Sequence, residues 1–154
     1  MIPLKQRLTI FFARGLGLGN LPKMPGTFGS LLGLPTAYAL TLLPGAVHIA
    51  LLLLGTYLAY RVIAAYEREI NIHDDARIVL DEWLGQSWTL AFCPVSIKYY
   101  CLGFVIFRLL DIVKPWPISA IDAGEGSLST LMDDVVAGVL GAGLLYVAST
   151  FLWI

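Results

Sequence analysis

Charged residues, histidines and cysteines are all scarce in this chain of 154 residues. Only 14% of the residues are charged, against about a quarter in ordinary soluble domains, whereas 58% are apolar. Hydrophobicity this high excludes a disordered chain and is unusual for a soluble domain. Ten basic residues stand against eleven acidic ones, so there is no basic excess that could bind a nucleic acid backbone.

The two cysteines, Cys93 and Cys101, are too few for a disulfide framework or a four-ligand zinc site, and both lie in apolar sequence. We expect them to fill the core. The two histidines, His48 and His73, are likewise too few for a mechanism that needs several imidazole groups. These scarcities disfavour disulfide, structural-zinc and multi-histidine chemistry.

Two long apolar runs are typical of membrane-spanning helices. Residues 135–154 carry no charge, and a helix of that length spans about 30 Å, the thickness of one hydrocarbon core. Residues 46–65 form a second run, broken only by Arg61 near its end, where a long side chain can reach the interface. The preceding run, 31–43, is short and contains a proline, so we expect a tilted or partial span that pairs with the second run in a hairpin over residues 31–66.

A second hairpin is predicted further along the chain. A straight helix through residues 83–107 would span about 37 Å and place Glu82 and Asp111 on opposite membrane faces. A bend at Pro94 would return the chain to the face from which it started. The cation and the two tyrosines that follow this proline are typical of an interfacial tip. We therefore predict a hairpin over residues 83–110.

The N-terminal segment, residues 1–20, lacks the small-residue cleavage site of a signal peptide. Its cations, which include Lys5, Arg7 and Arg14, suit an amphipathic segment on an anionic leaflet, and the positive-inside rule places them in the cytosol. Residues 1–154 are thus predicted to form a single all-α integral membrane domain. We expect a small helical bundle of about four membrane-embedded segments with an N-terminal amphipathic segment.

The acidic residues are clustered. All eleven lie between Glu67 and Asp134, and the two hairpins would bring them out on one side of the membrane. So many carboxylates near a region of low dielectric repel one another unless a proton, a base or a cation neutralises them. Carboxylate oxygens favour Mg²⁺, which binds one or two of them together with water and substrate phosphate. The cluster therefore predicts a magnesium site.

Basic and small residues near these acids suit a phosphate. Arg108, Asp111 and Lys114 recur every third residue and so lie near one face of a helix, which could hold both metal and phosphate. The segment 25–30 has two glycines and two hydroxyls before an apolar run, which is either a phosphate cradle or a helix cap with a turn.

Some residues near the last apolar run also have a structural interpretation. Thr130 and Asp133 have the spacing of a capping box, which would give Asp133 a structural role. Gly138, Gly141 and Gly143 are predicted to be close helix-packing positions in the last span.

Four segments together resemble one family, the phosphatidylglycerophosphatase A family of bacterial membrane phosphatases. They are residues 25–30 (PGTFGS), Asp74 with 78–85 (IVLDEWLG), 107–118 (FRLLDIVKPWPI) and 132–138 (MDDVVAG). They occur in the family's order across most of the chain. One departure is visible, because residues 126–129 carry serines where the family has a glycine-rich approach to the paired aspartates.

The resemblance implies a magnesium-dependent enzyme of the bacterial cytoplasmic membrane, with its active site facing the cytosol. Its substrate would be the phospholipid phosphatidylglycerophosphate, which would lose its terminal phosphate to give phosphatidylglycerol. No nucleic acid and no protein partner is implied.

The residues in these segments receive roles on this basis. The predicted metal ligands are Asp74, Asp81, Glu82, Asp111, Asp133 and Asp134. The predicted catalytic residues are Asp81, Glu82, Asp111, Asp134, Arg108 and Lys114. The predicted phosphate-binding residues are Gly26, Thr27, Gly29, Ser30, Arg108 and Lys114. Both a water molecule and an aspartate remain open as the nucleophile.

Two alternatives remain at this stage. A phosphatase of the same architecture could act on another lipid phosphate or on an isoprenoid phosphate, because headgroup selectivity depends on pocket shape. A non-enzymatic membrane protein that binds or conducts cations would also carry acids, but it predicts them facing one another within the spans. Here the acids lie at the ends of the spans beside bases, which favours the enzyme.

Overall fold

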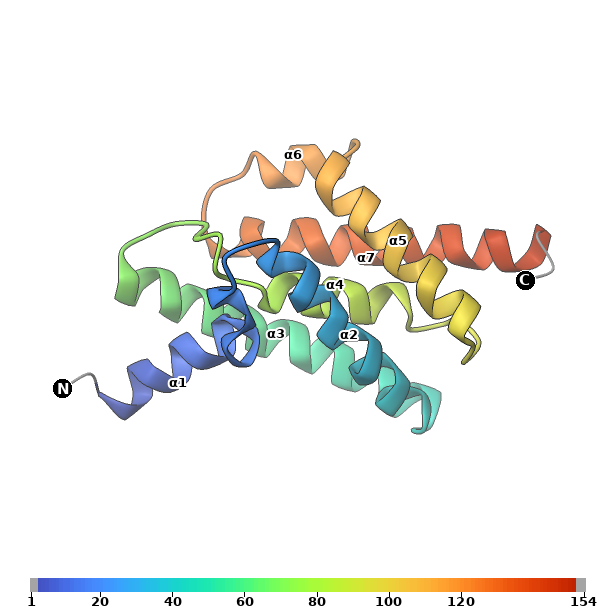
Figure 1. The fold of residues 1–154 in the computed structure, drawn as a ribbon, viewed down its shortest axis with the longest axis horizontal. Coiled ribbons are helices and arrows are strands. Elements are labelled where there is room, and N and C mark those ends of the chain that lie inside the picture. Colours follow the sequence, from blue (N-terminus) through green and yellow to red (C-terminus); the bar gives the residue numbers. More distant parts are fainter. Residues whose placement is uncertain (1–2, 152–154) are drawn as a thin grey trace.

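The computed structural model describes residues 3–151, and within that range every regular element is a helix (Figure 1). This confirms the predicted all-α class. The elements are α1 (Leu4–Ala13), η1 (Gly15–Asn20), α2 (Pro25–Thr41), α3 (Gly45–Ile70), α4 (Leu80–Thr89), α5 (Ile97–Val113), α6 (Ile118–Asp122) and α7 (Ser127–Phe151). Residues 1–2 of the predicted N-terminal segment and 152–154 of the predicted last span lie outside the described range.

Two of the described helices, α3 and α7, are long and apolar enough to cross a membrane. They correspond to the two runs predicted as full spans, although each helix begins before its run does. The outer face of α3 exposes a row of leucines, among them Leu51, Leu53, Leu54 and Leu58. An apolar surface of this extent is unusual on a soluble protein and suits contact with lipid. The described ends of the chain lie at opposite ends of the long axis of the molecule (Figure 1).

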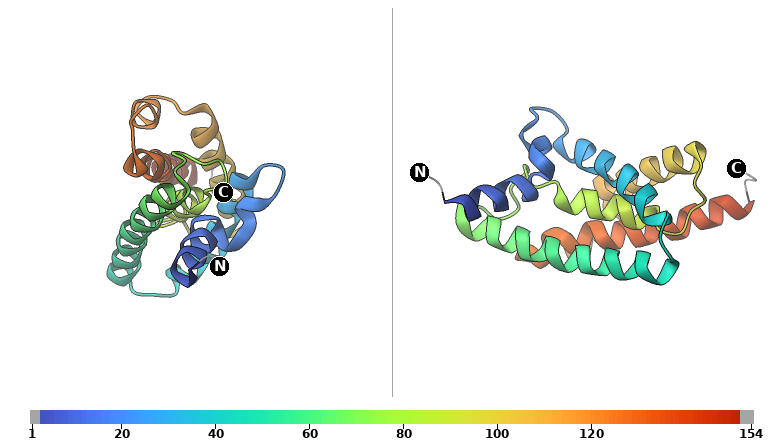
Figure 2. Two further views of the ribbon diagram at one scale, coloured as in Figure 1. Left: turned by 90° about the vertical axis from the view of Figure 1, so that its left-hand side faces the viewer. Right: turned by 90° about the horizontal axis from the view of Figure 1, so that it is seen from below.

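The chain reverses direction at both predicted hairpins (Figures 1 and 2). Helices α2 and α3 are joined by a short turn at residues 42–44, and α4 and α5 by the segment 90–96 around the predicted bend. Helix α2 begins at Pro25, earlier than residue 31, because proline is well tolerated in the first turn of a helix. The segment 25–30 is therefore the first part of a helix.

Helix α4 is short and central. It contacts α2, α3, α5 and α7, and most of its residues are buried although few of them are large and apolar. The buried ones are Leu80, Asp81, Gly85, Gln86, Ser87, Trp88 and Thr89. The first turn of α4 therefore carries two carboxylates, Asp81 and Glu82, into the interior of the bundle.

Glycines allow α4 and α7 to approach closely. A Cβ atom on Gly85 would lie 2.6 Å from the Asp134 carbonyl oxygen, and one on Gly138 would lie 2.9 Å from Cβ of Trp88. A Cβ on Gly141 would lie 3.1 Å from Thr89 Oγ1, whereas no described atom lies within 4 Å of the corresponding position at Gly143. The predicted packing role is confirmed for Gly138 and Gly141 and is wrong for Gly143.

The start of α7 corrects a second prediction. The helix begins at Ser127, so Thr130 lies inside it and the predicted capping box does not form. The hydroxyl of Ser127 donates to the carboxylate of Glu67 on α3, and Thr130 Oγ1 lies 3.4 Å from the other oxygen of the same carboxylate. These contacts hold the first turn of α7 against α3, and the helix therefore starts before Asp133 and Asp134.

Candidate active site

A cavity of about 260 Å³ lies where α2 begins, α4 begins, α5 ends and α7 passes. The loop between α3 and α4 forms a further side of it. The lining residues are Met24, Pro25, Gly26, Asp74, Asp75, Ala76, Ile78, Asp81, Glu82, Arg108, Asp111, Lys114, Thr130, Asp133 and Asp134. All six predicted metal ligands and both predicted phosphate-binding bases are in this set.

Three carboxylates come closest to one another. Asp81, Glu82 and Asp134 each present an oxygen atom, and these three atoms all lie within 4.8 Å of one another. Asp81 and Asp134 are 7% and 4% exposed, so little water is available to screen their charges. Burial raises the pKa of both Asp81 and Glu82, and the charge of Asp81 raises that of Glu82 further. Three carboxylates this close repel one another unless a proton or a cation neutralises them.

Arg108 and Asp111 form an ion pair on the cavity side of α5, three residues apart as predicted. Arg108 also donates toward Ser30 Oγ on α2 at 3.4 Å, and its buried Nε has no hydrogen-bond partner among the described residues. Asp111 is outside the group of three carboxylates. The pair places a guanidinium with spare donors beside that group.

Lys114 connects α5 with α6 and α7. It ends α5 in a left-handed conformation, and its ammonium group donates to Asp122 and, at 2.6 Å, to Asp133. Burial opposes the charge of Lys114, but the two carboxylate partners outweigh burial and raise its pKa. The predicted metal ligand Asp133 is therefore paired with a base through one oxygen, whereas its Oδ1 has no described hydrogen-bond partner.

The predicted phosphate cradle is only partly at the cavity. Gly26 lines it, and a Cβ atom there would lie 3.3 Å from Arg108 Nη1 and would collide with the Glu82 carboxylate. Gly29 packs against α4, where a Cβ would lie 2.7 Å from the Val79 carbonyl oxygen. Ser30 is buried and donates to the Gly26 carbonyl oxygen at 2.9 Å. Thr27, Gly29 and Ser30 do not line the cavity, so most of this segment fits α2 against α4.

Asp74 borders the cavity in a left-handed backbone conformation, with φ of 49°. Its backbone N–H donates to Glu67 Oε1 at 3.0 Å, and the same oxygen accepts a hydrogen bond from His73 Nδ1 at 2.8 Å. Asp74 lies apart from the three closely grouped carboxylates. Glu67, at the end of α3, therefore fixes the backbone of the loop that carries Asp74.

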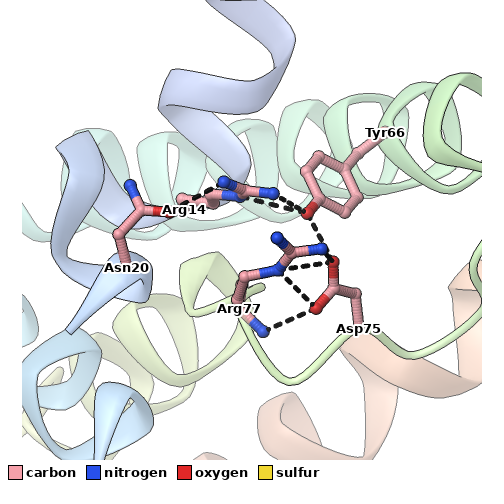
Figure 3. Close-up of polar contacts among 5 residues, drawn as sticks. All are labelled: Arg14, Asn20, Tyr66, Asp75 and Arg77. Atoms are coloured by element: carbon pink, nitrogen blue, oxygen red, sulfur yellow. Dashed lines mark hydrogen bonds and ion pairs between the residues drawn. The ribbon is translucent and has the colours of Figure 1, made fainter. Parts of the chain in front are cut away.

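Asp75 lines the cavity, although the sequence analysis did not identify it as a site residue. Figure 3 shows its polar contacts. Arg77 donates to both oxygens of its carboxylate, and Tyr66 on α3 donates to Oδ2 at 2.6 Å. The Arg77 guanidinium holds the pKa of Asp75 well below its usual range. Arg14, which we predicted to lie on the lipid surface, turns inward and donates to the Tyr66 hydroxyl at 2.8 Å. The end of α1 is thereby tied to the cavity loop.

This network predicts a structural cost for Tyr66→Phe. The variant removes a buried hydroxyl that accepts from Arg14 and donates to Asp75, and a lost buried partner costs about 1–3 kcal/mol of unfolding free energy. We expect a lower thermal midpoint in detergent. Tyr57→Phe is the matched control, because that hydroxyl is exposed and, among the described residues, accepts a hydrogen bond from Arg61 alone. Equal midpoints for the two variants would contradict the assignment.

Comparison with known proteins identifies the family. The family model described as Phosphatidylglycerophosphatase A matches residues 11–149. The chain belongs to the phosphatidylglycerophosphatase A family. It is 39% identical over 136 residues to Phosphatidylglycerophosphatase A of Escherichia coli K12, covering 87% of this chain and 79% of that protein. It is 36% identical over 135 residues to the protein of the same name from Haemophilus influenzae, covering 82% and 80%.

A third relative of this chain has a different name. It is a Bacteroides thetaiotaomicron protein whose assigned name, phosphatidylinositol-3-phosphatase, is provisional, and it is 34% identical over 150 residues, covering 92% of this chain and 93% of its own. No solved structure gives a significant match. The family membership makes this chain a phosphatase, that is, a phosphoric monoester hydrolase.

The cavity of this family member has a strong excess of acid. Seven of its lining residues are carboxylates and two are bases. A phosphomonoester dianion brought into such a cavity meets more repulsion than two bases can offset. Protons or a cation on some of these carboxylates would reduce that repulsion.

Proposed function

We propose that this protein is a Mg²⁺-dependent phosphatidylglycerophosphatase that removes the terminal phosphate of phosphatidylglycerophosphate. The observation that carries the proposal is the buried group of Asp81, Glu82 and Asp134 beside the Arg108 guanidinium, in a chain of this family. The substrate is taken from the names of the Escherichia coli and Haemophilus influenzae relatives.

The donor set fits Mg²⁺. The ion prefers carboxylate oxygens and keeps several waters, so two or three carboxylates at one side of a cavity with room for water suit it better than a closed cage. Glu82 Oε2 and Asp133 Oδ1 are buried without hydrogen-bond partners among the described residues. A bound cation would supply the partner that buried oxygens usually have. Asp81, Glu82 and Asp134 would hold the ion, and Asp74, Asp111 and Asp133 line the same cavity.

The protein's own groups then have distinct tasks. When bound, Mg²⁺ would offset the charge of the phosphate and polarise its oxygens. Arg108 would donate to phosphoryl oxygens through the nitrogens that its pairing with Asp111 leaves free, and so stabilise charge that develops during transfer. Lys114 would neutralise Asp133 and add positive charge at the same side. The nucleophile is either a water molecule or one of the aspartates.

We further propose that the cavity opens toward the cytosol from a bacterial cytoplasmic membrane. Lys5 and Arg7 on the exposed side of α1 suit an anionic cytoplasmic leaflet, and Leu4, Leu8 and Phe11 beside them are exposed apolar groups that suit its interface. In this arrangement α3 and α7 cross the bilayer, and the α2 and α4–α5 segments complete the membrane-embedded bundle.

A second substrate has a specific observation in its favour. The relative from Bacteroides thetaiotaomicron is matched over more of its length than the other two and bears the name of a phosphatidylinositol-3-phosphatase. Both candidate lipids carry a phosphomonoester on a polar headgroup, so the same acidic cavity suits either. Selectivity then depends on how the headgroup fits beyond the phosphate.

The test is phosphate release by the detergent-purified protein from phosphatidylglycerophosphate, with phosphatidylinositol 3-phosphate and phosphatidic acid as competing substrates. We expect preferred release from phosphatidylglycerophosphate. Chelation with EDTA should lower that release by at least about tenfold, and added Mg²⁺ should restore it, because Lewis-acid stabilisation supplies several kcal/mol.

Three results would contradict the proposal. Full release in EDTA would exclude the metal role, and preferred release from phosphatidylinositol 3-phosphate would replace the substrate while keeping the chemistry. Release from none of the three lipids by folded protein would favour a membrane protein that binds cations without catalysis.

A further inference from the structure

A second, apolar cavity lies between α2 and α5, two of the helices that border the acidic cavity. Its volume is about 410 Å³, and it opens at the surface of the bundle. Its lining residues are Leu34, Pro35 and Tyr38 of α2, together with Val95, Ser96, Ile97 and Tyr100 from the α4–α5 connection and the start of α5. None of the residues that line it carries a charge.

The two cavities lie along one seam. Helices α2 and α5 contact each other and run side by side (Figure 1). On α2, Gly26 of the acidic cavity precedes Leu34 of the apolar cavity by eight residues, and on α5 Tyr100 precedes Arg108 by eight. Eight helical residues advance about 12 Å, so both helices give the same separation. The seam therefore leads from the acidic cavity to the apolar one.

The direction of the seam matches that of a lipid. Helix α2 runs from the acidic cavity toward the turn at residues 42–44, from which α3 begins its apolar, membrane-spanning stretch. The apolar cavity, near that turn, therefore lies deeper along the candidate span than the acidic cavity does. A lipid whose phosphate lies at the interface extends its acyl chains in this direction.

Two polar groups on this path are buried and unsatisfied. The Tyr100 hydroxyl has no hydrogen-bond partner among the described residues, although Tyr100 lines the apolar cavity. Gln86 on α4 is fully buried against Gly33 of α2, and neither atom of its amide has a described partner. Leaving buried polar groups unpaired costs free energy, so such groups usually have a partner.

We infer that the α2–α5 seam is the acyl-chain subsite of the substrate lipid. The inference rests on the proposed function and names where the remainder of that substrate binds. The phosphomonoester occupies the acidic cavity, the glycerol and ester portion follows the seam, and the first part of one acyl chain fills the apolar cavity. The Tyr100 hydroxyl donates to an ester carbonyl oxygen of this lipid, which supplies the acceptor that the protein lacks.

The test compares a chain-bearing substrate with its deacylated headgroup. Val95→Trp adds bulk to the apolar cavity from an exposed loop position, away from the acidic one. Excluding about two methylene groups weakens binding about tenfold, so KM for dioleoyl phosphatidylglycerophosphate should rise by that factor. The kcat/KM for glycerophosphoglycerophosphate, which has no acyl chains, should stay unchanged. Leu53→Trp, on the lipid-facing side of α3, is the matched control and should leave the kinetic constants for both substrates unchanged.

Tyr100→Phe separates binding from folding. Removing an unpaired buried hydroxyl leaves stability equal or higher, so a purely structural role predicts no loss of activity. The inference predicts a several-fold rise in KM for the acylated substrate alone. An equal effect of Val95→Trp on both substrates, or no effect on either, would overturn the acyl-chain subsite.

Cross-linking gives a readout that needs no turnover. A substrate analogue with a photoreactive diazirine in one acyl chain should label peptides that contain residues 34–38 and 95–100, and excess unlabelled substrate should suppress that label. Labelling confined to the outer face of α3 would overturn the subsite. If the wild-type protein hydrolyses another lipid phosphate instead, the proposed substrate is wrong. The acylated and deacylated forms of that other lipid can then be compared in the same way, and this comparison still tests whether the α2–α5 seam binds an acyl chain.

Discussion

Replacing Asp134 by asparagine is expected to lower kcat by more than about 10³-fold while leaving the protein folded. The amide introduced by this substitution keeps the shape of the side chain but lacks its negative charge. Asp134 is 4% exposed, and its carboxylate presents an oxygen within 4.8 Å of oxygens of Asp81 and Glu82, so a cation bound by the three groups would lose one of its carboxylate ligands. The measurement is phosphate release at saturating substrate over a range of Mg²⁺ concentrations.

Stability distinguishes this loss from unfolding. Without a cation the three buried carboxylates repel one another, so Asp134→Asn should have an equal or higher thermal midpoint in EDTA. Wild-type protein should gain stability when Mg²⁺ is added, because a ligand of the folded state stabilises it, and the variant should gain much less.

The matched control for this prediction is Glu125→Gln. Glu125 lies in the exposed loop before α7 and is absent from the lining of the acidic cavity. The Glu125→Gln variant should retain both the phosphatase activity and the stabilisation by Mg²⁺. A fully active Asp134→Asn protein would remove Asp134 from the site, and a variant with a much lower midpoint would show that the aspartate is structural.

Sequence patterns predicted the elements that depend on local composition. The apolar runs in α3 and α7 are long enough to predict a helix by themselves, and both helices are present. The start of α7 was missed, because polar residues at a helix start can be paired inside the protein. Ser127 begins α7 against Glu67, a residue 60 positions away, and no local spacing rule contains that contact.

The sequence predicted that the acidic residues cluster, but it did not predict which of them contact one another. Two hairpins suffice to bring every carboxylate to one end of the bundle. Which of them meet depends on how α4 crosses α7. That crossing gives Asp133 and Asp134 different neighbours. Asp133 faces Lys114, whereas Asp134 faces Asp81. Adjacent residues on a helix point about 100° apart, so the two side chains meet different partners.

Asp75 shows what sequence reasoning missed. Its importance comes from Tyr66 and Arg77, and the Tyr66 contact joins the end of α3 to a loop without regular structure. One signal was available, because Asp75 and Arg77 are two residues apart in a short loop, a spacing that allows a carboxylate to bind a nearby backbone N–H and guanidinium. The link onward to Arg14 of the N-terminal segment had no such signal.

Adding one methyl group at the α4–α7 crossing should have the second large effect. Gly138→Ala places a Cβ 2.9 Å from Cβ of Trp88 and against the Gly85 carbonyl oxygen, and backbone at such a distance cannot move without shifting the helix. We expect a loss of about 1–3 kcal/mol of unfolding free energy from overpacking. Separating the helices by even about 1 Å also moves Asp134 away from Asp81 and Glu82, and a displacement of that size costs about 10²-fold in turnover.

Gly143→Ala provides the control for that substitution. It makes the same chemical change on the same helix, but no described atom lies within 4 Å of its added Cβ. Alanine also favours a helix by up to about 1 kcal/mol over glycine, so this control should be neutral or slightly stabilised. Thermal midpoints and phosphate release measured for both variants separate helix propensity from packing. If Gly138→Ala kept full activity, the close approach of α4 to α7 would not be what assembles the three carboxylates.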